Sequence, residues 1–193
     1  MPNFLPQSVY DDLAIRNPWR NADSGSFVAG SVAQTMSRTT AVANLTALLS
    51  GREDLQLIWL NQGQRIASIT HYSATTAGAT LTAQWFSLRN ASRQLLAVTV
   101  DDTNVAWAAD TAKTLALAVP YTVRASGYYY VGRMIAATTV PTLRGRTGIA
   151  ALNAIAPING GTTTDTGLTT PATAPATSSV ITATVNDVLV TLS

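Results

Sequence analysis

Short apolar segments separated by turn residues recur along the chain from about residue 42. In the stretch "ANLTALLSGREDLQLIWLNQGQRIASITHY", one apolar segment ends at Ser50-Gly51, a second runs from Leu55 to Leu60, and a third runs from Arg65 to Tyr72. Apolar runs of this length between glycine- and asparagine-containing turns are typical of successive antiparallel strands. The whole chain offers about eight such segments at a spacing of roughly 10 residues, which predicts an all-β sandwich, jelly roll or barrel.

Charged residues make up only 11% of the chain, against about 25% in an average globular protein. Alanine and threonine take their place, so hydroxyl and amide groups carry most of the polarity. Such a surface favours a subunit that packs against copies of itself over a cytosolic enzyme. The net charge is +2 and the arginines are dispersed along the chain. No basic run interleaved with aromatic residues occurs, which argues against nucleic-acid binding.

The first 40 residues differ from the rest and predict an extended N-terminal arm. Prolines interrupt them, and neither a helical nor a strand period persists. Single apolar residues nevertheless recur, which suits an arm that is anchored at intervals on another surface. These anchoring residues are Phe4, Leu5, Val9, Tyr10, Leu13, Ile15 and Trp19.

Residues 41–193 are predicted to form the β-sandwich domain, with a long external loop at about 141–180. The stretch "GGTTTDTGLTTPATAPATSS" within it has low complexity and many turn residues. The N-terminus lacks the apolar run of a signal peptide, and no window approaches the length of a membrane span. We therefore expect no membrane insertion.

Residues that could perform chemistry are few. Glu53 is the one glutamate and is followed by Asp54, and this pair is predicted to be solvated in a turn. His71 is the one histidine and is expected to be an amphipathic residue near a strand end. There are no cysteines, so thiolate metal sites and cysteine nucleophiles are excluded. We expect no catalytic, cofactor-binding or metal-binding residues.

The segment "SGYYYVGRM" raises the question of an aromatic binding platform. On a strand, Tyr128 and Tyr130 face one way and Tyr129 faces the other. Packing in the core or at an interface is the favoured interpretation. The alternative is a platform for host-surface glycans, which requires several exposed rings on one face. Its candidate residues are Trp85, Trp107, Tyr121 and Tyr128.

Several linked stretches resemble minor tail, head-fibre-like or decoration proteins of tailed bacteriophages, especially those that infect actinobacteria. The stretches that carry this resemblance are "AWAADTAKTLAL", "PYTV", "GYYYVG", "ATTVPTLRG" and "TGLTTPATAPAT". The resemblance covers about residues 42–193. It implies an antiparallel β-sandwich of jelly-roll type that assembles as a homotrimer and is carried on the virion without catalytic residues.

The expected function is therefore that of a non-enzymatic structural protein of a tailed-phage virion, assembled in the host cytoplasm. Its expected partners are copies of itself and the major capsid or tail proteins of the same particle. Two alternatives stay open at this point. One is a capsid decoration protein that stabilises the head, and the other is a carbohydrate-binding module for host-surface glycans.

Overall fold

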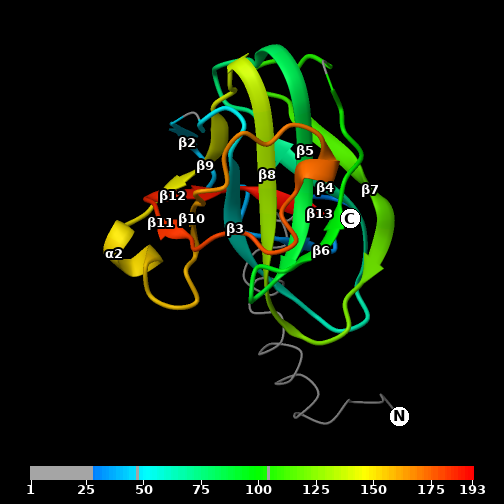
Figure 1. Cartoon of the computed structure of the whole chain (residues 1–193). Helices are drawn as coiled ribbons and strands as arrows, with labels where there is room; N and C mark the ends of the chain where they lie inside the picture. Colours follow the sequence, from blue (N-terminus) through cyan, green and yellow to red (C-terminus); the bar gives the residue numbers. More distant parts are fainter. Residues whose placement is uncertain (1–27, 47, 104) are drawn as a thin grey trace, which may run out of the picture.

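The computed structural model describes residues 28–46, 48–103 and 105–193 (Figure 1). The anchoring residues predicted for the N-terminal arm all lie outside these ranges. Within the described residues the regular secondary structure is almost entirely β-strand, and every strand pairing is antiparallel. An all-β antiparallel sandwich is thus confirmed, while its connection as a jelly roll stays a prediction.

The strands form three sheets. The four-stranded sheet has the order β1 (Ala33–Gln34), β13 (Val190–Leu192), β4 (Arg65–Tyr72) and β7 (Ala112–Thr122). The six-stranded sheet has the order β11 (Thr182–Ala183), β10 (Gly160–Thr162), β3 (Glu53–Leu60), β8 (Gly127–Thr139), β5 (Ala79–Asn90) and β6 (Leu95–Val98). The three-stranded sheet has the order β12 (Asn186–Val188), β9 (Leu143–Thr147) and β2 (Ala43–Leu45). Two short helices complete the described elements, α2 (Ala150–Asn153) and the 3-10 turn η1 (Pro171–Thr173).

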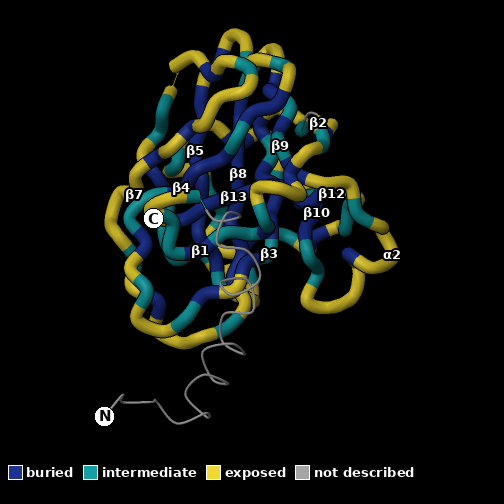
Figure 2. Tube along the Cα trace, turned by 180° about the vertical axis from the view of Figure 1, so that it is seen from behind, coloured by how far each residue is buried: buried dark blue, intermediate teal, exposed yellow. Residues whose placement is uncertain are grey.

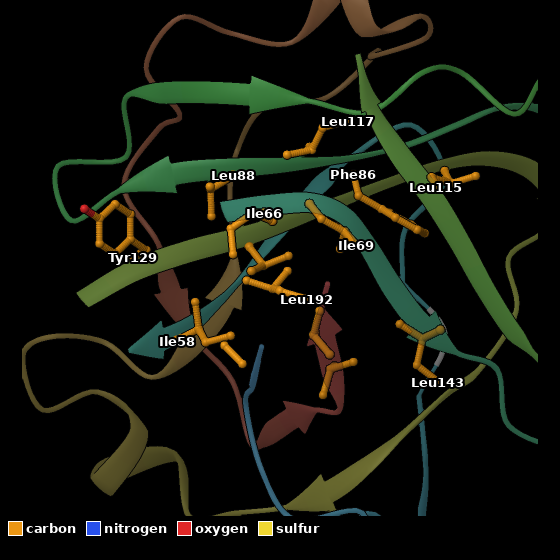
Figure 3. Close-up of a cluster of buried hydrophobic side chains, with 14 of the residues drawn as sticks. Ile58, Ile66, Ile69, Phe86, Leu88, Leu115, Leu117, Tyr129, Leu143 and Leu192 are labelled. Atoms are coloured by element: carbon orange, nitrogen blue, oxygen red, sulfur yellow. The ribbon is translucent and has the colours of Figure 1, made fainter. Parts of the chain in front are cut away.

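The main core lies between the four-stranded and six-stranded sheets (Figure 3). Because alternate side chains of a strand point to opposite faces, each long strand sends every second residue into this core. Ile58 of β3, Phe86 of β5 and Ile69 of β4 are among these inward residues, and all three are buried. We call the face of each sheet that meets this core its inner face.

The outer face of the six-stranded sheet is also covered. Residues 163–179, which we call the strap, cross in front of β8 and β5 in orange (Figure 1). Leu168 of the strap packs with Trp85 and Met134 in a second buried cluster. The low-complexity segment therefore lies outside the sheets except for its first three residues, which form β10. The predicted external loop of 141–180 nevertheless also contains β9, α2 and β10.

The boundary predicted between arm and domain at residue 40 is too late. Strand β1 lies within the range assigned to the arm, and its Ala33 pairs with Leu192 of β13. The backbone N–H of Val32 donates to the carbonyl of Leu192 at 2.7 Å. This pairing covers the edge of β13, and a two-residue strand is too short to show a period in the sequence. The folded domain therefore begins before residue 33.

Among the described residues, no helix combines the length and the apolar character that a bilayer crossing requires.

Candidate functional site

Two of the four aromatic residues predicted to bind glycans are buried and cannot form an exposed platform. Trp85 is covered by the strap, and its indole N–H donates to the carbonyl of Thr169 at 2.9 Å. Trp107 lies in the main core, where its ring meets Phe86 edge-on at 6.3 Å between centroids. Both assignments are therefore corrected. The two indoles stabilise the fold through burial.

The other two candidates differ from each other. Tyr121 is partly buried against the main core, and burial raises the pKa of its hydroxyl. Tyr128 is 46% exposed on the outer face of β8, beside Trp59 of β3, which is 41% exposed. Their ring centroids lie 5.0 Å apart with planes at 88°. Perpendicular rings share no common plane, so this pair offers a corner instead of the coplanar surface that a sugar platform needs.

Trp59 was not among the predicted candidates, although the alternation of side chains along its strand could have identified it. Trp59 is two residues beyond Leu57 and is the register partner of Tyr128. Its indole N–H donates to Oδ1 of Asn61 in the following turn, at 3.2 Å. This bond fixes the exposed ring at the end of the sheet.

A second group of exposed apolar side chains surrounds the short helix α2. Ile149, Leu152, Ile155 and Val185 are 64%, 61%, 63% and 40% exposed. Helix α2 stands away from the sheets at the side of the molecule (Figure 1), where the trace is mostly exposed when seen from behind (Figure 2). We call these four residues the apolar projection.

The apolar projection is held in place from beneath by a buried carboxylate. Asp187 of β12 is 1% exposed. Its Oδ1 accepts hydrogen bonds from the side-chain amides of Asn153 at 3.0 Å and Asn159 at 2.6 Å, and its Oδ2 accepts one from Nε of Arg146 at 3.0 Å. The backbone N–H of Gly148 donates to the carbonyl of Val185 at 2.6 Å. The exposed apolar side chains are thus presented on a cross-linked loop.

The sequence around the projection contains no charge. No Asp, Glu, Lys or Arg occurs in residues 147–164 or in residues 166–186. Several exposed apolar side chains grouped in an uncharged part of a domain favour a contact with another molecule. The projection is the strongest candidate for a functional surface among the described residues.

The prediction that Glu53 and Asp54 are solvated turn residues is wrong. Both lie in β3 and both are fully buried. Glu53 points to the outer face and pairs with Arg89, with Nη2 and Oε2 2.8 Å apart. Asp54 points to the inner face, where burial raises the pKa of its carboxyl despite the nearby charge of Arg133. Successive residues of a strand face opposite ways, so two acids in a row enter two different environments.

His71 is also more enclosed than predicted. It lies one residue before the end of β4, near a strand end as predicted, but its side chain is completely buried. Its ring lies 4.4 Å from that of Phe86. Burial, with a smaller contribution from the charge of Arg133, holds the pKa of His71 well below its usual value. Burial therefore favours the neutral form of the imidazole.

Two further acidic side chains are engaged with cations. Asp102 contacts Nζ of Lys113 at 2.5 Å, and Asp110 contacts Nη2 of Arg144 at 2.5 Å. Within residues 28–46, 48–103 and 105–193, no three His, Asp or Glu side chains are grouped so that they could hold a metal ion.

No protein-family model matches the chain, and comparison with curated proteins gives no match either.

Proposed function

We propose that the chain is a non-enzymatic structural subunit of a tailed-phage virion, which self-associates and projects its β-sandwich from the particle. The observation that carries this proposal is the apolar projection around α2. A surface subunit needs a preformed contact, and the hydrogen bonds of Asp187 preform this one. The virion context rests on the sequence resemblance of residues 42–193.

The edge of the four-stranded sheet supports self-association. Strand β7 is an edge strand, and Thr99 and Val100 pair with it only around Ala116 and Leu117. Its exposed side chains carry no charge, because Lys113 is buried. Those exposed residues are Ala112, Thr114, Ala116, Ala118, Val119, Pro120 and Thr122. Uncharged edges invite pairing with another chain unless a neighbour covers them, which favours an assembled state, with a homotrimer as the proposed form.

Immunogold labelling of purified virions tests whether the protein is a structural subunit of the particle. It also distinguishes a tail or fibre component from a capsid decoration protein. A structural subunit is expected to label intact particles at a fixed place. Label on the tail or fibre supports the projecting role, and label over the head supports the alternative of a capsid decoration protein. Particles that carry no label, from a lysate that contains the protein, would contradict both.

The N-terminal arm provides a second test of incorporation. Each anchoring side chain that becomes buried contributes roughly 1.5–3 kcal/mol, while ordering the backbone costs about 1–2 kcal/mol per residue. Docking is therefore favourable only when most anchors engage together. Deletion of residues 1–27, which leaves β1 intact, should give a folded, self-associating protein that no longer enters virions. Circular dichroism and virion immunoblots measure the two properties.

A matched substitution controls for the deletion. Replacing Phe4, Tyr10 and Trp19 together by serine keeps the length of the arm. Like the deletion, it should reduce incorporation of the protein into virions. If the deletion protein enters virions as well as wild type, the anchor lies elsewhere. If it fails to fold, residues 1–27 belong to the sandwich.

The second candidate function is carbohydrate binding at the exposed rings of Trp59 and Tyr128, which would contact a sugar from two perpendicular sides and not as a coplanar platform. Aromatic faces stack on sugar rings, and amide groups such as that of Asn61 lie beside the pair. Binding to a glycan array that Trp59→Ala abolishes, and that Trp59→Phe retains in part, would support this function. An array that gives no signal with the assembled protein would exclude the array's glycans as ligands.

A further inference from the structure

Asn159 and Gly160 form the one Asn-Gly step in the sequence, and they lie where the loop that carries α2 enters β10. The side-chain amide of an asparagine can attack the carbonyl carbon of its own residue. This attack closes a five-membered ring and breaks the following peptide bond. A glycine at the next position hinders the reaction least, because it has no side chain. Whether the reaction is assisted depends on what contacts the amide and the carbonyl of Asn159.

The side-chain amide of Asn159 is held by a buried carboxylate. Its Nδ2 donates to Oδ1 of Asp187 at 2.6 Å, and Asp187 is 1% exposed. The other oxygen, Oδ2, accepts from Nε of Arg146 at 3.0 Å. A general base must lie about 2.6–3.2 Å from the atom whose proton it takes. Oδ1 is therefore in position to receive a proton from Nδ2 when that nitrogen acts as the nucleophile.

The main-chain carbonyl of Asn159 accepts two hydrogen bonds. The backbone N–H of Leu57 donates to it at 2.7 Å, and Nε2 of Gln56 donates to it at 2.9 Å. Gln56 is buried, and its Oε1 accepts from the backbone N–H of Val188 at 3.0 Å. That bond fixes Nε2 as the atom that faces Asn159. Two donors at this distance stabilise the negative charge that develops on a carbonyl oxygen under attack.

The same contacts disfavour the competing reaction, in which the nitrogen of Gly160 attacks the side chain of Asn159 and ammonia leaves. That reaction requires Nδ2 to gain a proton, whereas the carboxylate of Asp187 accepts a hydrogen bond from it. It also gains nothing from the two donors, because they contact the main-chain oxygen. The arrangement favours cleavage of the chain over loss of ammonia.

Asn153 provides a comparison at the same carboxylate. Its Nδ2 also donates to Oδ1 of Asp187, at 3.0 Å. The residue after it is Ala154, whose methyl group hinders attack on the intervening carbonyl. Asn159 is thus the asparagine beside Asp187 at which the carboxylate, the two carbonyl donors and a following glycine occur together.

We propose that the chain cleaves itself slowly between Asn159 and Gly160. Nδ2 of Asn159 loses a proton to Asp187 and forms a bond to its own carbonyl carbon. The bond from that carbon to the nitrogen of Gly160 breaks, and the nitrogen takes the proton back from Asp187. The products are residues 1–159 with a C-terminal succinimide and residues 160–193 with a free amino group. No other reactant is consumed, and the inference is independent of the proposed virion role.

The two products are expected to stay associated. Residues 160–193 contain β10 and β13, which pair with β3 and β4 of the longer product. The cut frees one end of the loop that carries α2. Ile149, Leu152 and Ile155 are then joined covalently to the sandwich through β9 alone. Self-cleavage would in this way loosen the apolar projection without unfolding the domain.

Incubation of freshly purified full-length protein with protease inhibitors tests the proposal. Denaturing gels and mass spectrometry should show two fragments that accumulate at a rate independent of protein concentration. Early in the incubation their masses should add up to that of the intact chain, because the succinimide is one water lighter than the free acid. A chain that stays uncut, or that shows only the mass change of deamidation, would overturn the proposal. Fragments that never carry the succinimide would do the same.

Two variants identify the groups that act. Asp187→Asn removes the base and keeps the shape of the side chain, so it should slow cleavage by about 10²–10⁴-fold, as loss of a general base usually does. Asp165→Asn is the matched control, since that carboxylate accepts from the backbone N–H of Ser179 in the strap at 2.9 Å, and it should cleave as wild type does. If Asp187→Asn does not fold, Asn159→Gln decides, because its amide could close only a six-membered ring and should leave the chain intact. Cleavage of Asp187→Asn at the wild-type rate, or of Asn159→Gln at all, contradicts the proposed reaction.

Discussion

Arg89→Met is expected to destabilise the protein by about 3–5 kcal/mol, because it leaves the carboxylate of Glu53 buried without its counter-charge. Both side chains are completely buried, and the guanidinium donates to both carboxylate oxygens, from Nε at 2.9 Å and from Nη2 at 2.8 Å. Ser178 of the strap donates to the same carboxylate at 2.8 Å. Loss of the ion pair therefore weakens both the six-stranded sheet and the attachment of the strap to it.

Urea unfolding measures the effect, and Arg144→Met is its matched control. Arg144 pairs with Asp110 at the surface, where side-chain exposures are 32% and 56%, and exposed pairs contribute only about 0–1 kcal/mol. The double variant Glu53→Leu/Arg89→Met should recover part of the stability, since it removes the unpaired charge. An Arg89→Met protein as stable as Arg144→Met would show that the buried pair is not needed for the fold.

Gly132→Ala is expected to cost about 3 kcal/mol, although it adds one methyl group. Gly132 lies on the outer face of β8, where a Cβ atom would overlap Oγ of Ser87 and Oε1 of Glu53. These two oxygens share a hydrogen bond of 2.5 Å, so neither can move without breaking the network around Arg89. Overpacking alone costs typically 1–3 kcal/mol, and the disrupted ion pair adds to it.

The control for this variant is Gly127→Ala at the beginning of the same strand. A Cβ atom there meets nothing within 4 Å, so the change should stay within about 0.5 kcal/mol. Thermal and urea unfolding of both variants measure the difference. Equal stability of the two proteins would mean that the outer face of β8 has room that the structure does not show.

The long strands could be predicted from the sequence because their inward residues are large and regularly spaced. The segments predicted at 55–60 and 65–72 correspond to β3 at Glu53–Leu60 and β4 at Arg65–Tyr72. The shortest strands could not be predicted in the same way. Strand β1 has two residues, and its pairing depends on the free edge of β13 far away in the sequence.

Burial of polar and aromatic residues was the least predictable feature. Glu53 and Asp54 have the composition of a turn, yet each enters the fold opposite an arginine that comes from a distant strand. Trp85 has an outward-facing position on β5 and is buried only because the strap covers it. The apolar projection was also missed, because exposure of its four residues depends on how the loop containing α2 leaves the sheets.

We propose that this domain functions as an assembled subunit, and sedimentation equilibrium at micromolar concentration measures whether it self-associates. Wild type should have a mass well above that of the 20.2 kDa chain, with three chains as the expected number. Ile149→Ser/Leu152→Ser should shift the equilibrium toward the single chain, because it removes apolar contact area from the projection. Val180→Ser, at a residue that is 69% exposed outside the projection, should sediment as wild type. A wild-type protein that sediments as a clean monomer would contradict the claim.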